Sequence, residues 1–206
     1  MLSQLDEVVR TTYPGPSISF SMVDGIRAVM ELGVDEIGRE KLAKNLGIGN
    51  GAVRTLIKRL ERLGLLEKGP HGCRLTKKGQ GVFGILKTKL MVGEISGGPL
   101  STDRYTKTLL IRGGANSVKM GLEQRDAAIR EGATGATSLI FDSGRFVIPG
   151  GSKDCEQDFP SLLWQKLRKS LRPVDGDLII VCSGRSKQIS TRGAYSVAWT
   201  ALRRVM

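Results

Sequence analysis

The chain has one histidine, three cysteines and only 5% aromatic residues, and each scarcity excludes a class of function. A single histidine rules out a zinc site that needs two histidines of one chain. The cysteines are odd in number and form no C-x-x-C pair, which argues against a disulfide framework and a cysteine-built zinc site and fits a reducing cytoplasm. So few aromatic side chains argue against a protein that binds single strands by stacking bases.

Long apolar runs are also missing. No run approaches the roughly 18 to 20 residues that cross a bilayer. The first ten residues lack the basic-then-apolar order of a signal peptide. We therefore expect a cytoplasmic protein with no membrane partner, and we predict no metal or other cofactor.

Positive charge, by contrast, is abundant. Lys and Arg number 32 against 20 Asp and Glu, which gives a net charge of +12 and a pI near 10.0. The segment from Arg39 to Lys78 contains 11 Lys and Arg and 3 Asp and Glu, a charge of +8. An acidic partner is therefore expected for this segment.

The chain of 206 residues is long enough for two small domains. Residues 92–104 are rich in Gly, Ser and Pro and have no helical period, which is typical of a linker. We therefore predict an N-terminal domain over 1–91 and a C-terminal α/β domain over 105–206.

The N-terminal domain has the pattern of a helix-turn-helix followed by a strand-turn-strand. Apolar residues at helical spacing predict helices over 19–32, 39–46 and 50–63, and the last two flank a Gly47-Ile-Gly49 turn. Residues 68–76 then read as a strand, a Gly-Pro turn and a returning strand, before a further helix over 78–90. This order presents the helix over 50–63 to a DNA major groove.

That helix carries its cations on one face, because Arg54, Lys58 and Arg62 recur every four residues opposite an aliphatic face. The candidate DNA-binding residues are Asn50, Gly51, Arg54, Thr55, Lys58, Arg59, Arg62, His71 and Arg74. Alternatives remain open here: Asn50 as a helix cap, His71 as an exposed turn residue, and the basic face as a solvated surface.

From about residue 20 to 90 the chain resembles the winged helix-turn-helix domains of bacterial and archaeal transcription regulators. The Leu-Gly-Leu-Leu-Glu-Lys of 63–68 and the Leu-Thr-Lys-Lys-Gly of 75–79 look like their entry into and exit from the wing. The whole organisation resembles archaeal winged-helix proteins with an uncharacterised C-terminal domain. The resemblance implies a sequence-specific regulator that binds double-stranded DNA as a homodimer.

The C-terminal domain has the order β-α-β-β-α-β-α. Strands are predicted over 108–112, 137–141, 146–148 and 177–182, and helices over 117–131, 159–171 and 190–204. This order predicts an α+β protein whose second domain is a split β-α-β, ferredoxin-like sheet with helices on one face. That domain is expected to sense a ligand, to dimerise, or both.

Glycine-containing loops follow several of these strands, and two of them lead toward helix N-termini, where backbone amides favour an anion. The candidate residues for a small anionic effector are Arg112, Gly113, Gly114, Asn116, Ser183, Gly184 and Arg185. No loop matches a nucleotide-binding motif, and ordinary turn chemistry explains the glycines equally well.

No catalytic residue is predicted, and we expect a protein that is not an enzyme. Asp154, Glu156 and Asp158 alternate in a loop but lack the rest of a calcium site, and Cys182 follows an apolar run with no second histidine to activate it. One alternative is a small nucleotide- or phosphate-using enzyme with a winged helix, since the Arg-Phe-Val-Ile-Pro-Gly-Gly of 145–151 is similar to a fragment of archaeal CTP-dependent riboflavin kinases. Another is a nonspecific chromatin-type DNA binder, because residues from 91 onward carry a charge of +6.

Overall fold

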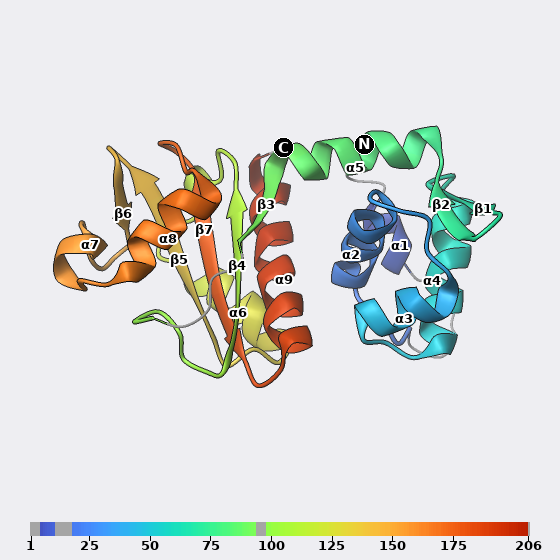
Figure 1. Ribbon diagram of the computed structural model, residues 1–206, viewed down its shortest axis with the longest axis horizontal. Helices are drawn as coiled ribbons and strands as arrows, with labels where there is room; N and C mark the ends of the chain where they lie inside the picture. Colours follow the sequence, from blue (N-terminus) through green and yellow to red (C-terminus); the bar gives the residue numbers. More distant parts are fainter. Residues whose placement is uncertain (1–4, 11–17, 94–97, 206) are drawn as a thin grey trace. The chain divides into compact units, whose positions relative to one another are not determined.

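The computed structural model describes residues 5–10, 18–93 and 98–205, and the chain forms two compact units, Met1–Lys87 and Thr88–Met206 (Figure 1). The boundary therefore precedes the predicted linker over 92–104. Leu90–Gly93 form a strand of the second unit, so the predicted start of the linker was wrong. Residues 94–97 of the predicted linker lie outside the described residues.

The first unit consists of helices followed by a two-stranded hairpin and a further helix. Its elements are α1 (Asp6–Val9), α2 (Met22–Leu32), α3 (Arg39–Leu46), α4 (Asn50–Arg62), β1 (Leu66–Gly69), β2 (Gly72–Leu75) and α5 (Lys77–Lys89). The predicted helices and the predicted strand pair are confirmed within a few residues. The short helix α1, which buries Leu5 and Val8, was not predicted.

Local sequence explains where α2, α3 and α4 begin and end. Ser21 and Asp24 form a capping box at the start of α2. Gly47 ends α3 with a φ of 72°, a left-handed conformation that favours glycine, and the chain can therefore turn at once into α4. Along α4, Val53, Leu56 and Leu60 are fully buried and hold the helix against the rest of the unit.

The hairpin is tied to the helices on both sides. Its strands pair antiparallel, with Leu66 opposite Leu75. Ile37, just before α3, exchanges two backbone hydrogen bonds of 3.0 and 2.9 Å with Cys73 of β2. The hairpin is thus fixed to the segment that leads into α3.

The second unit is a five-stranded sheet covered by helices. Its elements are β3 (Leu90–Gly93), β4 (Tyr105–Ile111), η2 (Ala115–Ser117), α6 (Leu122–Arg130), β5 (Gly135–Asp142), β6 (Arg145–Val147), α7 (Cys155–Asp158), α8 (Leu162–Leu171), β7 (Leu178–Gly184) and α9 (Lys187–Val205). The predicted order of strands and helices is confirmed, and β3, η2 and α7 are additions.

All neighbouring strands of this sheet are antiparallel, in the order β3-β4-β7-β5-β6. Strands β4 and β5 are therefore parallel to each other, with β7 inserted between them, and this is a split β-α-β unit. A ferredoxin-like sheet would insert the strand that follows β5 in the chain, but β6 lies at the edge beside β5. The ferredoxin-like strand order was therefore wrong.

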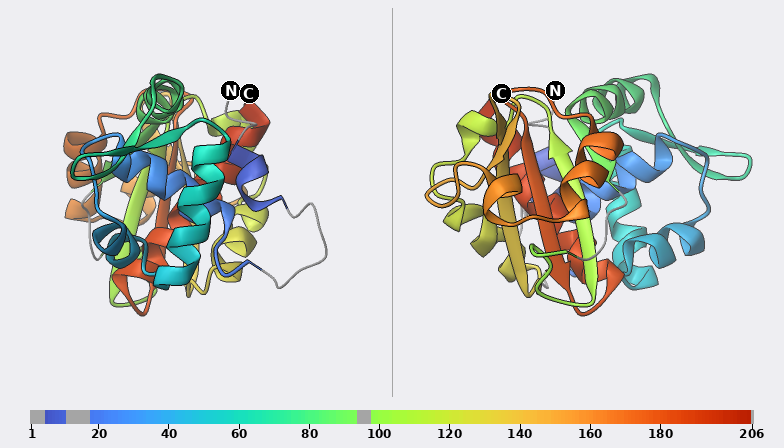
Figure 2. Two further views of the ribbon diagram at one scale, coloured as in Figure 1. Left: turned by 90° about the vertical axis from the view of Figure 1, so that its right-hand side faces the viewer. Right: turned by 60° about the vertical axis from the view of Figure 1, so that its left-hand side comes forward.

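Helices cover both faces of the sheet, not one face as predicted (Figures 1 and 2). On one face Ile179 and Val181 of β7 share a core with Trp164 and Leu167 of α8. On the other face a Cβ at Gly193 of α9 would lie 2.6 Å from the Sγ of Cys182. The physical reason is that every residue of β7 is buried, so both faces of this strand need a cover.

Two of the three glycines of α5, Gly79 and Gly84, predict opposite effects on stability. A Cβ at Gly79 would lie 2.0 Å from the backbone oxygen of Leu65, whereas nothing lies within 4 Å of one at Gly84. Gly79→Ala should destabilise the first unit by about 1–3 kcal/mol. Gly84→Ala should stabilise it by about 0.5–1 kcal/mol, because alanine loses less backbone entropy in a helix. Native-state hydrogen exchange of buried α4 amides measures both changes, and equal effects would contradict the packing.

Candidate nucleic-acid interface

The outward face of α4 is a cationic surface. Arg54, Lys58 and Arg62 are exposed. Within the described part of the chain, no carboxylate lies within ion-pair distance of these three side chains. Buried Val53, Leu56 and Leu60 turn the opposite face inward, so these cations point away from the core.

The start of α4 leaves its backbone open. The N-cap residue is Gly49, so Asn50 is the first residue of the helix and not its cap, and its side chain is exposed. No atom lies within 4 Å of the position that a Cβ at Gly51 would take. The Oγ1 of Thr55 donates to the carbonyl oxygen of Gly51 at 3.1 Å, so this hydroxyl already has one partner.

Arg59, one of the candidate DNA-binding residues, is already engaged within the first unit. Its Nη1 donates to the carbonyl oxygens of Val8 at 2.8 Å and Arg10 at 3.2 Å. The guanidinium also lies 5.6 Å from the centroid of the Phe20 ring. Arg59 therefore fastens the N-terminal segment to α4.

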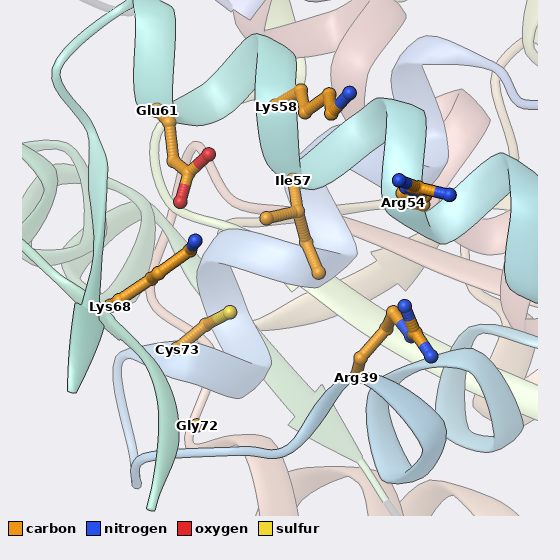
Figure 3. Close-up of a pocket in the computed structure, with 8 residues that line it drawn as sticks. All are labelled: Arg39, Arg54, Ile57, Lys58, Glu61, Lys68, Gly72 and Cys73. Carbon is orange, nitrogen blue, oxygen red and sulfur yellow. The ribbon is translucent and has the colours of Figure 1, made fainter. Parts of the chain in front are cut away.

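A groove of about 540 Å³ lies between α4 and the hairpin (Figure 3). Four cations and one carboxylate surround a floor of Ile57 and Cys73; they are Arg39, Arg54, Lys58, Lys68 and Glu61. Burial raises the pKa of the Cys73 thiol, which keeps it neutral. Arg39 and Lys68 are not among the residues predicted from helix periodicity, although both lie in the segment of charge +8.

Two candidate DNA-binding residues, His71 and Arg74, lie in the hairpin and have different surroundings. The backbone N–H of His71 donates to the Oε1 of Glu36 at 2.6 Å, while its side chain is exposed at the turn. The Nε of Arg74 pairs with the Oε1 of Glu67, directly across the hairpin, at 2.8 Å. Glu67 therefore partly compensates the charge of Arg74 before any ligand binds.

The loop after β4 already holds an anion, which is the chain's own Asp177. This carboxylate is 1% exposed; it pairs with the guanidinium of Arg112 and accepts the backbone N–H of Gly113 at 3.0 Å. Arg112 also donates to the carbonyl oxygen of Arg172, past the end of α8. The proposed effector contacts of Arg112 and Gly113 are thus occupied by a structural ion pair.

The other candidate effector residues do not complete a site with them. Gly114 is buried, and a Cβ there would lie 3.0 Å from Ile111 and Leu178, so its glycine serves packing. Asn116 is exposed in η2. The Oγ of Ser183 accepts the backbone N–H of Thr102 at 3.1 Å. The expectation of one anion site was wrong for this set.

Strand register separates the two loops. Tyr105 pairs with Gly184, and Ile111 pairs with Leu178, so the loops after β4 and β7 lie at opposite ends of the strand pair. Seven paired residues span about 23 Å. At the second loop a Cβ at Gly184 would lie 2.7 Å from Ile189, and Arg185 is exposed. A small effector cannot contact both loops.

Two of the three acidic residues that alternate at 154–158 have partners within the second unit. Glu156 accepts two hydrogen bonds from Arg168, of 2.9 and 2.8 Å. Asp154 accepts the backbone N–H of Gln157 at the start of α7. Across residues 5–10, 18–93 and 98–205, no cluster of His, Cys, Asp and Glu is arranged to hold a metal ion. Burial raises the pKa of Cys182 to about 12, so its thiol is neutral.

The ion pair of Asp177 and Arg112 predicts a stability effect. Asp177→Asn should destabilise the second unit by about 2–3 kcal/mol, because it leaves a partly buried guanidinium without its charge partner. Trp164 and Trp199, the two tryptophans of the chain, lie in this unit, so urea unfolding followed by tryptophan fluorescence measures the change. Asp142→Asn, an exposed control, should stay within about 0.5 kcal/mol. Equal values for both variants would contradict the structural role.

Comparisons with known proteins agree with the division into two units. Residues 23–81 match the family described as PH0730-like, N-terminal domain, and residues 102–202 match a domain of unknown function, DUF4443. The fold is similar to that of the hypothetical protein PH0730 from Pyrococcus horikoshii OT3, with a TM-score of 0.69 at 23% identity, over 90% of this chain and 94% of that chain. No curated protein matches the chain.

These comparisons establish a fold shared with an archaeal protein. The archaeal part of the resemblance noted from the sequence is thereby supported. In the part of the chain that the structure describes, we find no helix with the length and apolar character of a membrane span.

Proposed function

We propose that this chain is a sequence-specific double-stranded DNA-binding transcription regulator whose first unit is a winged helix-turn-helix domain. In this proposal α3 and α4 form the helix-turn-helix, α4 enters the major groove, and the β1–β2 hairpin is the wing on the backbone or minor groove. The observation that carries the proposal is the exposed cationic face of α4 formed by Arg54, Lys58 and Arg62.

The position of each side chain suggests its role. Arg54 lies one turn into α4, close to the open backbone of Gly51, where a recognition helix contacts base edges. Lys58 and Arg62 follow along the same face, where they would neutralise phosphates. Arg39 and Lys68, on opposite sides of the groove, extend the positive field toward α3 and the hairpin (Figure 3).

We further propose that the second unit dimerises the regulator. A two-fold dimer would bind palindromic half-sites about 34–36 Å apart. The ion pair of Arg112 and Asp177 removes the main support for an anionic effector in this unit. Of the two roles expected for the second unit, ligand sensing and dimerisation, we propose dimerisation.

Selection of bound duplexes from fragmented genomic DNA, at low and at moderate salt, tests this function with the full-length chain. Enrichment of fragments that share a motif would support a specific regulator. Even retention of all fragments that vanishes with salt would favour a nonspecific chromatin-type binder. No retention at either salt would contradict DNA binding.

Arg54→Ala should reduce discrimination between the selected site and random duplex by about 1–3 kcal/mol, the contribution of a bidentate contact to a guanine. Competition binding measured by fluorescence anisotropy gives both affinities. Equal losses on the two duplexes would contradict a base contact by Arg54.

Lys58→Ala should weaken binding to all duplexes alike and lower the slope of log affinity against log salt by about 0.9, because one phosphate contact is lost. Lys87→Ala removes an exposed cation from α5 of the same unit and serves as the control. A slope for the Lys58 variant that equals the control would remove Lys58 from the interface.

A further inference from the structure

A second, smaller cavity of about 190 Å³ lies at the C-terminal end of α4, next to residues of the α1 segment. Three arginines and one carboxylate form most of its lining; they are Arg10, Arg59, Arg62 and Glu7. Its volume suits a single tetrahedral oxyanion, and its cations exceed its one carboxylate by two.

The arginines of this pocket differ in how firmly other groups hold them. Arg59 is anchored by the carbonyl oxygens of Val8 and Arg10 and so fixes the pocket wall. The side chain of Arg10 is 69% exposed, and its Nη1 lies 2.9 Å from the Oε1 of Glu7, whose side chain is itself 45% exposed. Such an exposed pair is weak, so an arriving anion can take Arg10 from Glu7.

Arg62 connects the pocket to the cationic face. It lies eight residues after Arg54 on the same stripe of α4, about 12 Å along the helix axis. A DNA strand presents one phosphate per 3.4 Å of its axis, so a strand that follows this stripe passes the pocket.

We propose that this pocket binds a phosphodiester of the DNA backbone through Arg10 and Arg62, with Arg59 as a positioning residue and Glu7 as a competing carboxylate. The inference rests on the proposed function and extends the interface to the N-terminal segment. The shared chemistry is a phosphate oxyanion, and its source is either the DNA backbone or a free phosphate.

Two substitutions with opposite expected signs test the proposal in the full-length chain. Arg10→Gln should weaken binding to a labelled mixed-sequence duplex by about three- to tenfold and lower the salt slope by about 0.9. Glu7→Gln should tighten binding by about two- to fivefold, because it releases Arg10 and removes a like charge from the path of the DNA.

The chain offers a matched control in Arg125 and Asp126, an exposed pair of the second unit with a separation of 3.9 Å. Arg125→Gln and Asp126→Asn carry the same changes in net charge and should alter affinity less than twofold. If the pocket variants behave like these controls while Lys58→Ala still lowers the salt slope, the pocket assignment fails and the proposed function survives.

Calorimetric titration with inorganic phosphate separates the two sources of the oxyanion. Weak binding that Arg10→Gln abolishes, together with DNA binding that responds as above, supports the assignment to DNA. Phosphate binding by a chain that retains no duplex would overturn both the DNA contact and the proposed function, and would reassign the pocket to a free phosphate.

Discussion

In the first unit, Val53, Leu56 and Leu60 bury one face of α4, and the rest of the candidate interface depends on that burial. A helix rotated by a third of a turn would bring Arg54 and Lys58 toward the core, where an unpaired charge is very costly. The apolar face therefore fixes which side chains point outward, and it does so without any contact by the cations themselves. The capping box of α2, the left-handed Gly47 and the backbone bonds between Ile37 and Cys73 then hold α4 and the hairpin as the two sides of one groove.

In the second unit the corresponding constraint is β7, which is buried on both faces. A strand of this kind must lie inside the sheet and needs helices on both sides, and that requirement places α8 and α9 on opposite faces. At its start Asp177 pairs with Arg112, accepts the amide of Gly113 and accepts the amide of Val174 at 2.9 Å. The sequence predicts that backbone amides of this loop could bind an anion. In the structure the amide of Gly113 instead donates to the carboxylate of Asp177 in the same unit.

Local patterns predicted the longer helices and most strands, because the helical spacing of α4 and the apolar run of β7 are each visible in consecutive residues. What depends on distant residues was missed. Arg59 meets its partners Val8 and Arg10 across about fifty positions, so helix periodicity alone made it one more surface cation. The sheet order and strand β3 arise from pairing between distant segments, which single-strand patterns do not encode. The continuous run from Leu178 to Cys182 did contain a signal, since a strand that is apolar on both faces argues for helices on both.

Net charge and available charge differ in this chain, and the difference bears on how it would bind DNA. The segment from Arg39 to Lys78 has a charge of +8, but Arg59 is fastened to the N-terminal segment and Arg74 is paired with Glu67. Nine cations of the segment remain, and five of them lie on α4 or beside its groove: Arg39, Arg54, Lys58, Arg62 and Lys68. A binder that relies on total charge gains from every cation, whereas positioned contacts need only the cations that lie where a helix would enter a groove. In the proposed interface the stripe of Arg54, Lys58 and Arg62 supplies such positioned contacts, and the other exposed cations of the segment add a diffuse electrostatic attraction.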